Sequence, residues 1–171
     1  SPALRDGVDQ DPQLFALAGE AYMQAREFSK ATEYFERAIR IAPKSAILHT
    51  ALSSSRMSQG DNARAIAELE MAAKLDPKSS QAGILLVMTH LRLKEPEKAL
   101  QAVTTLEKEH PDNPVVQNIK GGIYLSRNDP AKARTSFEKA LSLQPTYFPA
   151  AANLAQLDLR EDKQKKKKKR F

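Results

Sequence analysis

The chain of 171 residues contains no cysteine and no tryptophan, and aromatic residues make up only 6% of it. Without cysteine, disulfides and thiolate chemistry are excluded. No run of about 18 apolar residues is present, so we expect no membrane span. The first residues, from Ser1 onward, lack the charged-then-apolar pattern of a signal peptide, and we expect the sequence to begin inside a longer protein. The apolar share of 41% is sufficient for a continuous core.

Positive charge is concentrated at one end of the chain. The formal net charge is +6, yet residues 163–170 alone hold seven cations and no acid follows Asp162, which leaves −1 for residues 1–162. The basic character therefore does not indicate a specific nucleic-acid partner for the rest of the chain. Because blocks of like charge repel each other and rarely fold, residues 163–171 are predicted to be a disordered tail. Two alternatives remain open, a surface for anionic lipid, nucleic acid or polysaccharide, and a nuclear-localisation signal.

A period of 34 residues runs through the chain. It appears in two columns of equally spaced residues, the prolines Pro43, Pro77, Pro111 and Pro145 and the alanines Ala31, Ala65, Ala99 and Ala133. Such a period is the signature of a repeat architecture in which each unit buries its apolar face against its neighbours. We therefore number the repeat so that its proline is position 32.

Further columns describe the repeating unit as a hairpin of two helices. Position 8 is mostly small (Gly19, Ser53, Val87, Gly121), and position 24 is apolar and mostly large (Phe35, Leu69, Val103, Phe137). Position 11 is tyrosine in the first and fourth repeats (Tyr22 and Tyr124). Position 16 is always acidic, which predicts a cap for the second helix. Asp11, Ser45, Ser79 and Asn113 are predicted to cap the first helices. We expect helices near 12–25, 28–41, 46–59, 62–75, 80–93, 96–109, 114–127, 130–143 and 148–161.

These columns resemble the tetratricopeptide-repeat (TPR) family, whose fold is an all-α, right-handed superhelical solenoid of antiparallel helix hairpins. The resemblance implies a lead-in at 1–11, four repeats spanning 12–147, the first helix of a fifth repeat at 148–162, and the basic tail at 163–171. The four repeats have the boundaries 12–45, 46–79, 80–113 and 114–147. Gly19 and Tyr22, like the alanine and proline columns, fall on structural positions of the family motif.

Residues 74–162 resemble one bacterial subfamily more narrowly. The segments that carry this likeness are Asn113-Pro114, Gly121-Gly122, Phe137 to Leu141 and Phe148 to Leu157. They are similar to the TPR lipoprotein of exosortase (PEP-CTERM) exopolysaccharide systems. This resemblance implies a fragment of a periplasmic or cell-envelope protein, whereas a generic repeat protein would be expected in the cytoplasm.

No constellation of catalytic or metal-binding residues is present. His49 and His90 fall on packing positions, and His110 falls at the end of a helix, where a histidine is favourable. No phosphate-binding loop, zinc-protease motif or nucleophile elbow occurs. We therefore expect a binding protein without cofactor or metal, and not an enzyme.

The TPR resemblance implies that a partner binds the concave face, through positions 2, 5, 6, 9, 12 and 13 of each first helix. Exposed apolar patches of this kind usually mark binding sites. The candidate groove residues are Leu17, Glu20, Thr50, Ile84, Leu85, Met88, Val115, Asn118 and Ile119. The predicted partner is a protein or peptide of unknown identity, and the alternative reading is that neighbouring helices cover these residues.

Two further hypotheses follow from the same columns. In the first hypothesis, the chain is a structural unit of a larger envelope assembly and can self-associate. In the second, its basic tail binds anions. The carboxylate clamp of chaperone-adaptor TPR proteins is not expected, because the corresponding positions carry Ala16, Glu20, Ala51, Gln81 and Leu85 rather than lysine, asparagine and arginine.

Overall fold

The computed structural model describes residues 11–171, and this part of the chain contains helices and no strand. The predicted lead-in at 1–11 therefore lies outside the described residues, apart from Asp11. The helices are α2 (Pro12–Gln24), α3 (Phe28–Ile41), α4 (Ala46–Ser58), α5 (Asn62–Leu75), α6 (Gln81–Arg92), α7 (Pro96–Glu109), α8 (Pro114–Ser126), α9 (Pro130–Leu143) and α10 (Phe148–Lys169). The all-α prediction is confirmed.

The second helix of each hairpin has the predicted bounds, and the first helices α2, α4, α6 and α8 end one residue earlier than predicted. Of the predicted caps, Asp11, Ser45 and Asn113 accept hydrogen bonds from the first turns of α2, α4 and α8. Ser79 Oγ accepts from the backbone N–H of Gln81 at 3.3 Å. These short side chains satisfy N–H groups that have no partner within the helix.

The acidic column at position 16 caps only where the side chain is short. Asp61 and Asp129 accept from backbone N–H groups of α5 and α9, whereas Glu27 and Glu95 make no side-chain cap. The capping prediction is therefore wrong for the two glutamates, whose longer side chain is not among those preferred at the N-cap. In every repeat, however, this acid pairs with the cation three residues later, and the pairs are Glu27–Lys30, Asp61–Arg64, Glu95–Lys98 and Asp129–Lys132.

Each hairpin turns through one residue in the left-handed region of backbone space. These residues are Arg26, Gly60, Lys94 and Asn128, which stand 34 positions apart and have φ between 59° and 82°. The N–H of the following residue bonds to a carbonyl five residues earlier, for example Glu95 to His90 at 2.9 Å. This is the hydrogen bond of a Schellman motif, which satisfies carbonyls at the end of the first helix.

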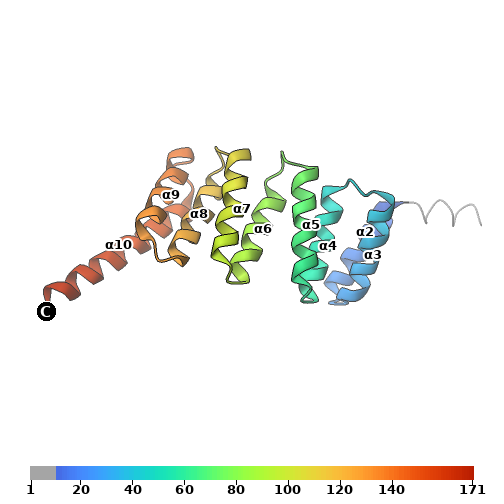
Figure 1. Cartoon of the computed structure of the whole chain (residues 1–171), viewed down its shortest axis with the longest axis horizontal. Helices are drawn as coiled ribbons and strands as arrows, with labels where there is room; N and C mark the ends of the chain where they lie inside the picture. Colours follow the sequence, from blue (N-terminus) through green and yellow to red (C-terminus); the bar gives the residue numbers. More distant parts are fainter. Residues whose placement is uncertain (1–10) are drawn as a thin grey trace, which may run out of the picture. The chain divides into compact units, whose positions relative to one another are not determined.

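The described part of the chain divides into two compact units, with the boundary between Leu86 and Val87, inside α6. In the first unit, α2 packs on α3, α3 on α4 and α4 on α5 (Figure 1). Ala31 and Phe35 of α3 form a buried cluster with Leu52 of α4. In the second unit, α7 packs on α8, α8 on α9 and α9 on α10. A buried apolar cluster of this unit contains Ala133, Phe137, Ala140, Ala150 and Leu157.

The two columns at positions 8 and 24 have complementary sizes. Both are buried in all four repeats, and the residues are paired as Gly19 with Phe35, Ser53 with Leu69, Val87 with Val103 and Gly121 with Phe137. A phenylalanine at position 24 thus occurs only where position 8 is glycine. The two sizes must compensate each other, because protein interiors have few voids and little room for extra atoms.

The structure of the C-terminal segment differs from our prediction. We predicted a helix ending near residue 162 and a disordered tail, whereas α10 continues to Lys169 with all of residues 162–171 exposed. The first half of α10 packs on α9 through Ala150 and Leu157. That contact provides the costly helical nucleus, and lysine is a good helix former, so the helix extends from a base already formed.

Candidate interaction surface

We use the term first-helix face for positions 2, 5, 6, 9, 12 and 13 of α2, α4, α6, α8 and α10. Each of the nine candidate groove residues is at least partly accessible to solvent. The most exposed apolar side chains among them are Leu17, with 61% of its surface accessible, and Met88, with 49%. The structure thus leaves these side chains available, in contrast to the buried columns at positions 8 and 24 and to the buried alanines of position 20 (Ala31, Ala65, Ala99 and Ala133).

In the first unit, the face is mixed in character. Leu17 and Glu20 lie on α2 and are exposed, and Ile47 on α4 has 80% of its surface accessible. Thr50 is half-buried, and its hydroxyl donates to the Ala46 carbonyl at 2.9 Å. This hydroxyl is therefore already engaged within its own helix.

Helix α6 carries Ile84, Leu85 and Met88 within one turn, and in the second unit α8 carries Val115 and Ile119. Ile84, Leu85, Val115 and Ile119 are partly exposed. Residues four apart lie on the same side of a helix, so Ile84 and Met88 share one side of α6, and Val115 and Ile119 one side of α8.

An amide pair lies beside these apolar residues in the second unit. Asn153 Nδ2 on α10 donates to Asn118 Oδ1 on α8 at 2.9 Å, and both side chains are partly exposed. Among the described residues, no hydrogen bond engages Asn118 Nδ2 or Asn153 Oδ1. A side-chain amide has two donors and an acceptor with two lone pairs, so the pair still offers donors on Asn118 and an acceptor on Asn153.

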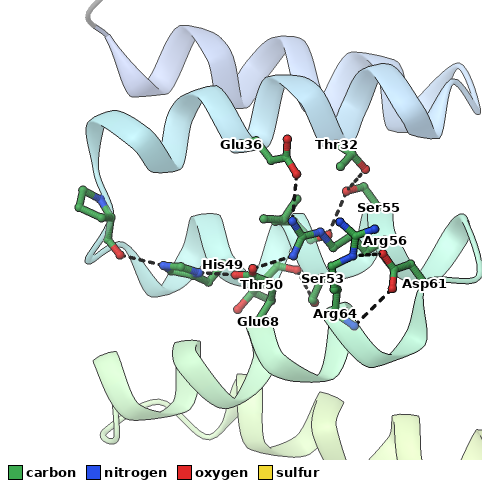
Figure 2. Close-up of polar contacts among 12 residues, drawn as sticks. Thr32, Glu36, His49, Thr50, Ser53, Ser55, Arg56, Asp61, Arg64 and Glu68 are labelled. Carbon is green, nitrogen blue, oxygen red and sulfur yellow. Dashed lines mark hydrogen bonds and ion pairs between the residues drawn. The ribbon is translucent and has the colours of Figure 1, made fainter.

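The first unit contains a polar network that the sequence analysis did not predict. Arg56 of α4 bonds to Glu68 of α5 at 2.8 Å and to Glu36 of α3 at 2.9 Å (Figure 2). Glu68 also contacts His49 Nδ1, and His49 Nε2 lies 2.8 Å from the Pro43 carbonyl oxygen. Arg56 occupies position 11, where the first and last repeats have tyrosine, so charge replaces aromatic packing in this repeat.

The histidines lie where the sequence predicted. His49 and His90 are buried in packing positions, and His110 is the C-cap residue of α7. His90 Nδ1 lies 2.9 Å from Glu95 Oε2. The hydrogen bonds from Lys98 and His90 lower the pKa of the Glu95 carboxyl below its usual value.

A second network joins three helices of the second unit around Glu107 of α7. Its carboxylate accepts hydrogen bonds from Gln117 at 2.8 Å, Lys120 at 2.6 Å and Lys139 at 3.1 Å. Burial raises the pKa of this carboxyl, but the bonds from Lys120, Gln117 and Lys139 together outweigh it and lower the pKa to about 2. Glu107 thus holds α7, α8 and α9 together through charge-assisted bonds.

Neither a metal site nor a membrane-spanning helix occurs within residues 11–171. No group of three or more histidine, cysteine, aspartate or glutamate side chains in this range has a geometry able to hold a metal ion. None of the helices from α2 to α10 has the length and apolar character needed to cross a membrane.

The helix hairpins, their 34-residue period and the buried small residues define a helical-repeat protein. Three family models described as tetratricopeptide repeat match residues 16–80, 56–123 and 116–147. Together they extend over residues 16–147, and the chain belongs to the tetratricopeptide-repeat family. Members of this family are generally interaction scaffolds without catalysis. No curated protein matches the chain significantly.

Several solved structures share the fold at low sequence identity. PilF of Pseudomonas aeruginosa is 24% identical, with a TM-score of 0.71 over 92% of this chain and 72% of that one. MamA of Desulfovibrio magneticus RS-1 is 18% identical, with a TM-score of 0.69 over 91% and 88%. YrrB, described as a TPR protein with an unusual peptide-binding site, is 19% identical, with a TM-score of 0.67 over 85% and 75%. None of these matches singles out the exosortase subfamily.

Proposed function

We propose that this chain is a protein-binding scaffold that holds a peptide segment of its partner on the first-helix face of the second unit. The observation that carries the proposal is the exposure of Met88, at 49%, together with the partly exposed Val115 and Ile119. Apolar side chains left accessible beside polar neighbours are typical of interaction sites. Methionine adapts to partners of different shape. The similarity to a peptide-binding TPR protein supports the same reading.

The amide pair favours a partner with an accessible backbone. An extended peptide presents a carbonyl and an N–H in alternation, and the free donors of Asn118 and the free acceptor of Asn153 complement them. The apolar residues then receive side chains of the peptide. Burial of their surface contributes roughly 25 cal/mol per Å² removed from water.

The test begins with peptides selected from a displayed random library by the intact chain. Binding of the selected peptides is then measured by fluorescence anisotropy. We expect Met88→Glu and Ile119→Lys to weaken binding by tenfold or more, because each introduces a charge that binding would desolvate. Circular dichroism should remain unchanged, since both side chains are already accessible to solvent.

Matched controls place the same charges on exposed sites of second helices, with Gln101→Glu on α7 and Thr135→Lys on α9. These controls should change the affinity less than twofold. Glu68 on α5 is unsuitable as a control because it forms an ion pair with Arg56. If the control substitutions abolish binding and the first-helix substitutions do not, the peptide site lies elsewhere.

A second candidate function, a unit of a larger assembly, is favoured by the outer side of α10. Ala150 and Leu157 are buried against α9, whereas Phe148 and Leu159 have 78% and 61% of their surfaces accessible. Residues 148 and 159 lie 11 positions apart, which is three helical turns, so they share one side of the helix. That side would accept a further helix or a second copy. Sedimentation velocity tests this, because Leu159→Glu should abolish any concentration-dependent association.

A further inference from the structure

The C-terminal half of α10, residues 163–170, forms what we call the basic helix. Seven of its eight residues are lysine or arginine, and all are exposed. None of the seven makes an ion pair with another residue in the range 11–171, whereas Asp158 and Glu161, one turn earlier, are engaged by Arg134 of α9. The positive charge of this segment is therefore not neutralised within the described chain.

The cations surround the helix rather than lining one side. Successive residues of an α-helix are rotated by about 100°, so the seven cations leave no gap wider than about 100° around the axis. No apolar residue occurs between Arg160 and Phe171. A membrane-surface helix instead combines a polar side with an apolar side that enters the lipid. The basic helix has no such side, and a flat anionic surface would contact only part of its charge.

Duplex DNA matches both the shape and the charge density of this segment. Residues 163–170 extend about 10 Å along the helix axis, and a duplex carries about six phosphate charges over that length. The major groove, about 12 Å wide, admits an α-helix and has phosphates along both walls. We propose that the basic helix lies in the major groove of double-stranded DNA and binds its backbone without reading base sequence.

The anchoring of α10 adds an expectation about helix stability. The packing of Ala150 and Leu157 on α9 holds the base of the helix, but like charges three and four residues apart destabilise its end. Phosphates in the groove would neutralise this repulsion. We therefore expect helical content to rise when the intact chain binds DNA.

The experiment measures anisotropy of a fluorescent 20-base-pair duplex with the intact chain at several salt concentrations. Up to seven neutralised phosphates predict a slope of log K against log salt as steep as about −6. Affinity should then fall by up to about four-thousandfold between 50 and 200 mM salt. Replacing residues 165–169 with glutamine should abolish binding. A matched variant replaces five exposed cations outside the tail with glutamine and should retain it; these are Arg40, Lys44, Lys74, Lys78 and Lys108.

Three comparisons distinguish this proposal from simpler charge attraction. Gln164→Pro keeps every charge but interrupts the helix, and should weaken duplex binding by at least tenfold. A single strand of the same length should bind at least tenfold more weakly than the duplex, as should vesicles of phosphatidylcholine and phosphatidylserine in a 3:1 ratio. Equal binding of the proline variant, equal binding of single strands, or stronger binding of the vesicles would each overturn the proposal.

Discussion

Gly121 of α8 lies so close to the ring of Phe137 in α9 that a β-carbon at residue 121 would come within 2.6 Å of Phe137 Cδ1. The next residue, Gly122, has no atom within 4 Å of the equivalent position. Both glycines lie inside the same helix, where glycine costs about 1 kcal/mol relative to alanine. Gly121 is therefore required for close packing, whereas Gly122 has only the cost in helix propensity, and comparing the two separates these effects.

Substituting these two glycines by alanine should change stability in opposite directions. We expect Gly121→Ala to lower the free energy of unfolding by about 1–3 kcal/mol, because the methyl group overpacks the hairpin. Gly122→Ala should raise it by about 0.5–1 kcal/mol through helix propensity alone. Urea denaturation followed by circular dichroism measures both. Shifts of the same sign would contradict the packing of Gly121 against Phe137.

The complementary sizes at positions 8 and 24 predict a compensating double substitution. Phe137→Leu alone leaves a cavity and Gly121→Ser alone overpacks, but together they recreate the combination that Ser53 and Leu69 make in the second repeat. We expect the double variant to be at least about 1 kcal/mol more stable than the sum of the single effects. Phe137→Leu combined with Gly19→Ser serves as the control. Its effects should be additive, because Gly19 packs against Phe35 in the other unit.

Lys94 has a φ of 59°, a backbone conformation that favours glycine. Lys94→Gly should therefore stabilise the chain by about 0.5–1 kcal/mol, net of the entropy that glycine loses on folding. Thermal unfolding should show a higher midpoint. Arg92→Gly, two residues earlier in the last turn of α6, provides the comparison and should lower the midpoint. A loss of stability from Lys94→Gly would mean that the lysine side chain contributes more than its backbone costs.

The network around Glu107 predicts a dependence of stability on pH. Its pKa is about 2 in the folded chain, below the ordinary value of 4.5 expected after unfolding. The unfolded chain therefore takes up a proton first as the pH falls, and the stabilisation, complete above pH 4.5, is lost between pH 4.5 and 2. We expect Glu107→Gln to cost about 1–2 kcal/mol at pH 7, allowing for solvent screening of the partly exposed lysines.

Measured by urea denaturation, the difference between Glu107→Gln and the unsubstituted chain should shrink as the pH approaches 2. Glu138→Gln, on the exposed side of α9, should show no such trend. A difference for Glu107→Gln that stays constant from pH 7 to pH 2 would show that the carboxylate is not the stabilising group.

The sequence predicted the repeating part of the fold well, because the period repeats the same physical requirement four times. The alanines of position 20, such as Ala65 and Ala99, are fully buried, and the prolines follow the ends of the second helices as expected. Capping was predicted correctly for the short side chains but not for Glu27 and Glu95, because side-chain length as well as charge decides which acid caps the helix.

Features that depend on a single repeat escaped prediction. Arg56 and Glu68 occupy ordinary positions of their helices, and only the distances between α3, α4 and α5 show that they meet. The candidate groove residues were identified by their position in a family pattern, and the structure adds that each of them is at least partly exposed. The extension of α10 was not predicted, because the prediction considered the repulsion between the lysines but not the packing of the first half of the helix on α9.

The left-handed turn residues give all four hairpins the same turn geometry. In all four repeats the N–H of the residue after the turn bonds to the carbonyl five residues earlier at 2.8–2.9 Å, from Glu27 to Tyr22 through Asp129 to Tyr124. Because the joint has the same geometry whether it contains arginine, glycine, lysine or asparagine, its shape is a property of the backbone. A chimaera that exchanges whole 34-residue modules at residues 26, 60, 94 or 128 therefore keeps every joint intact, and only the packing between neighbouring modules must be matched.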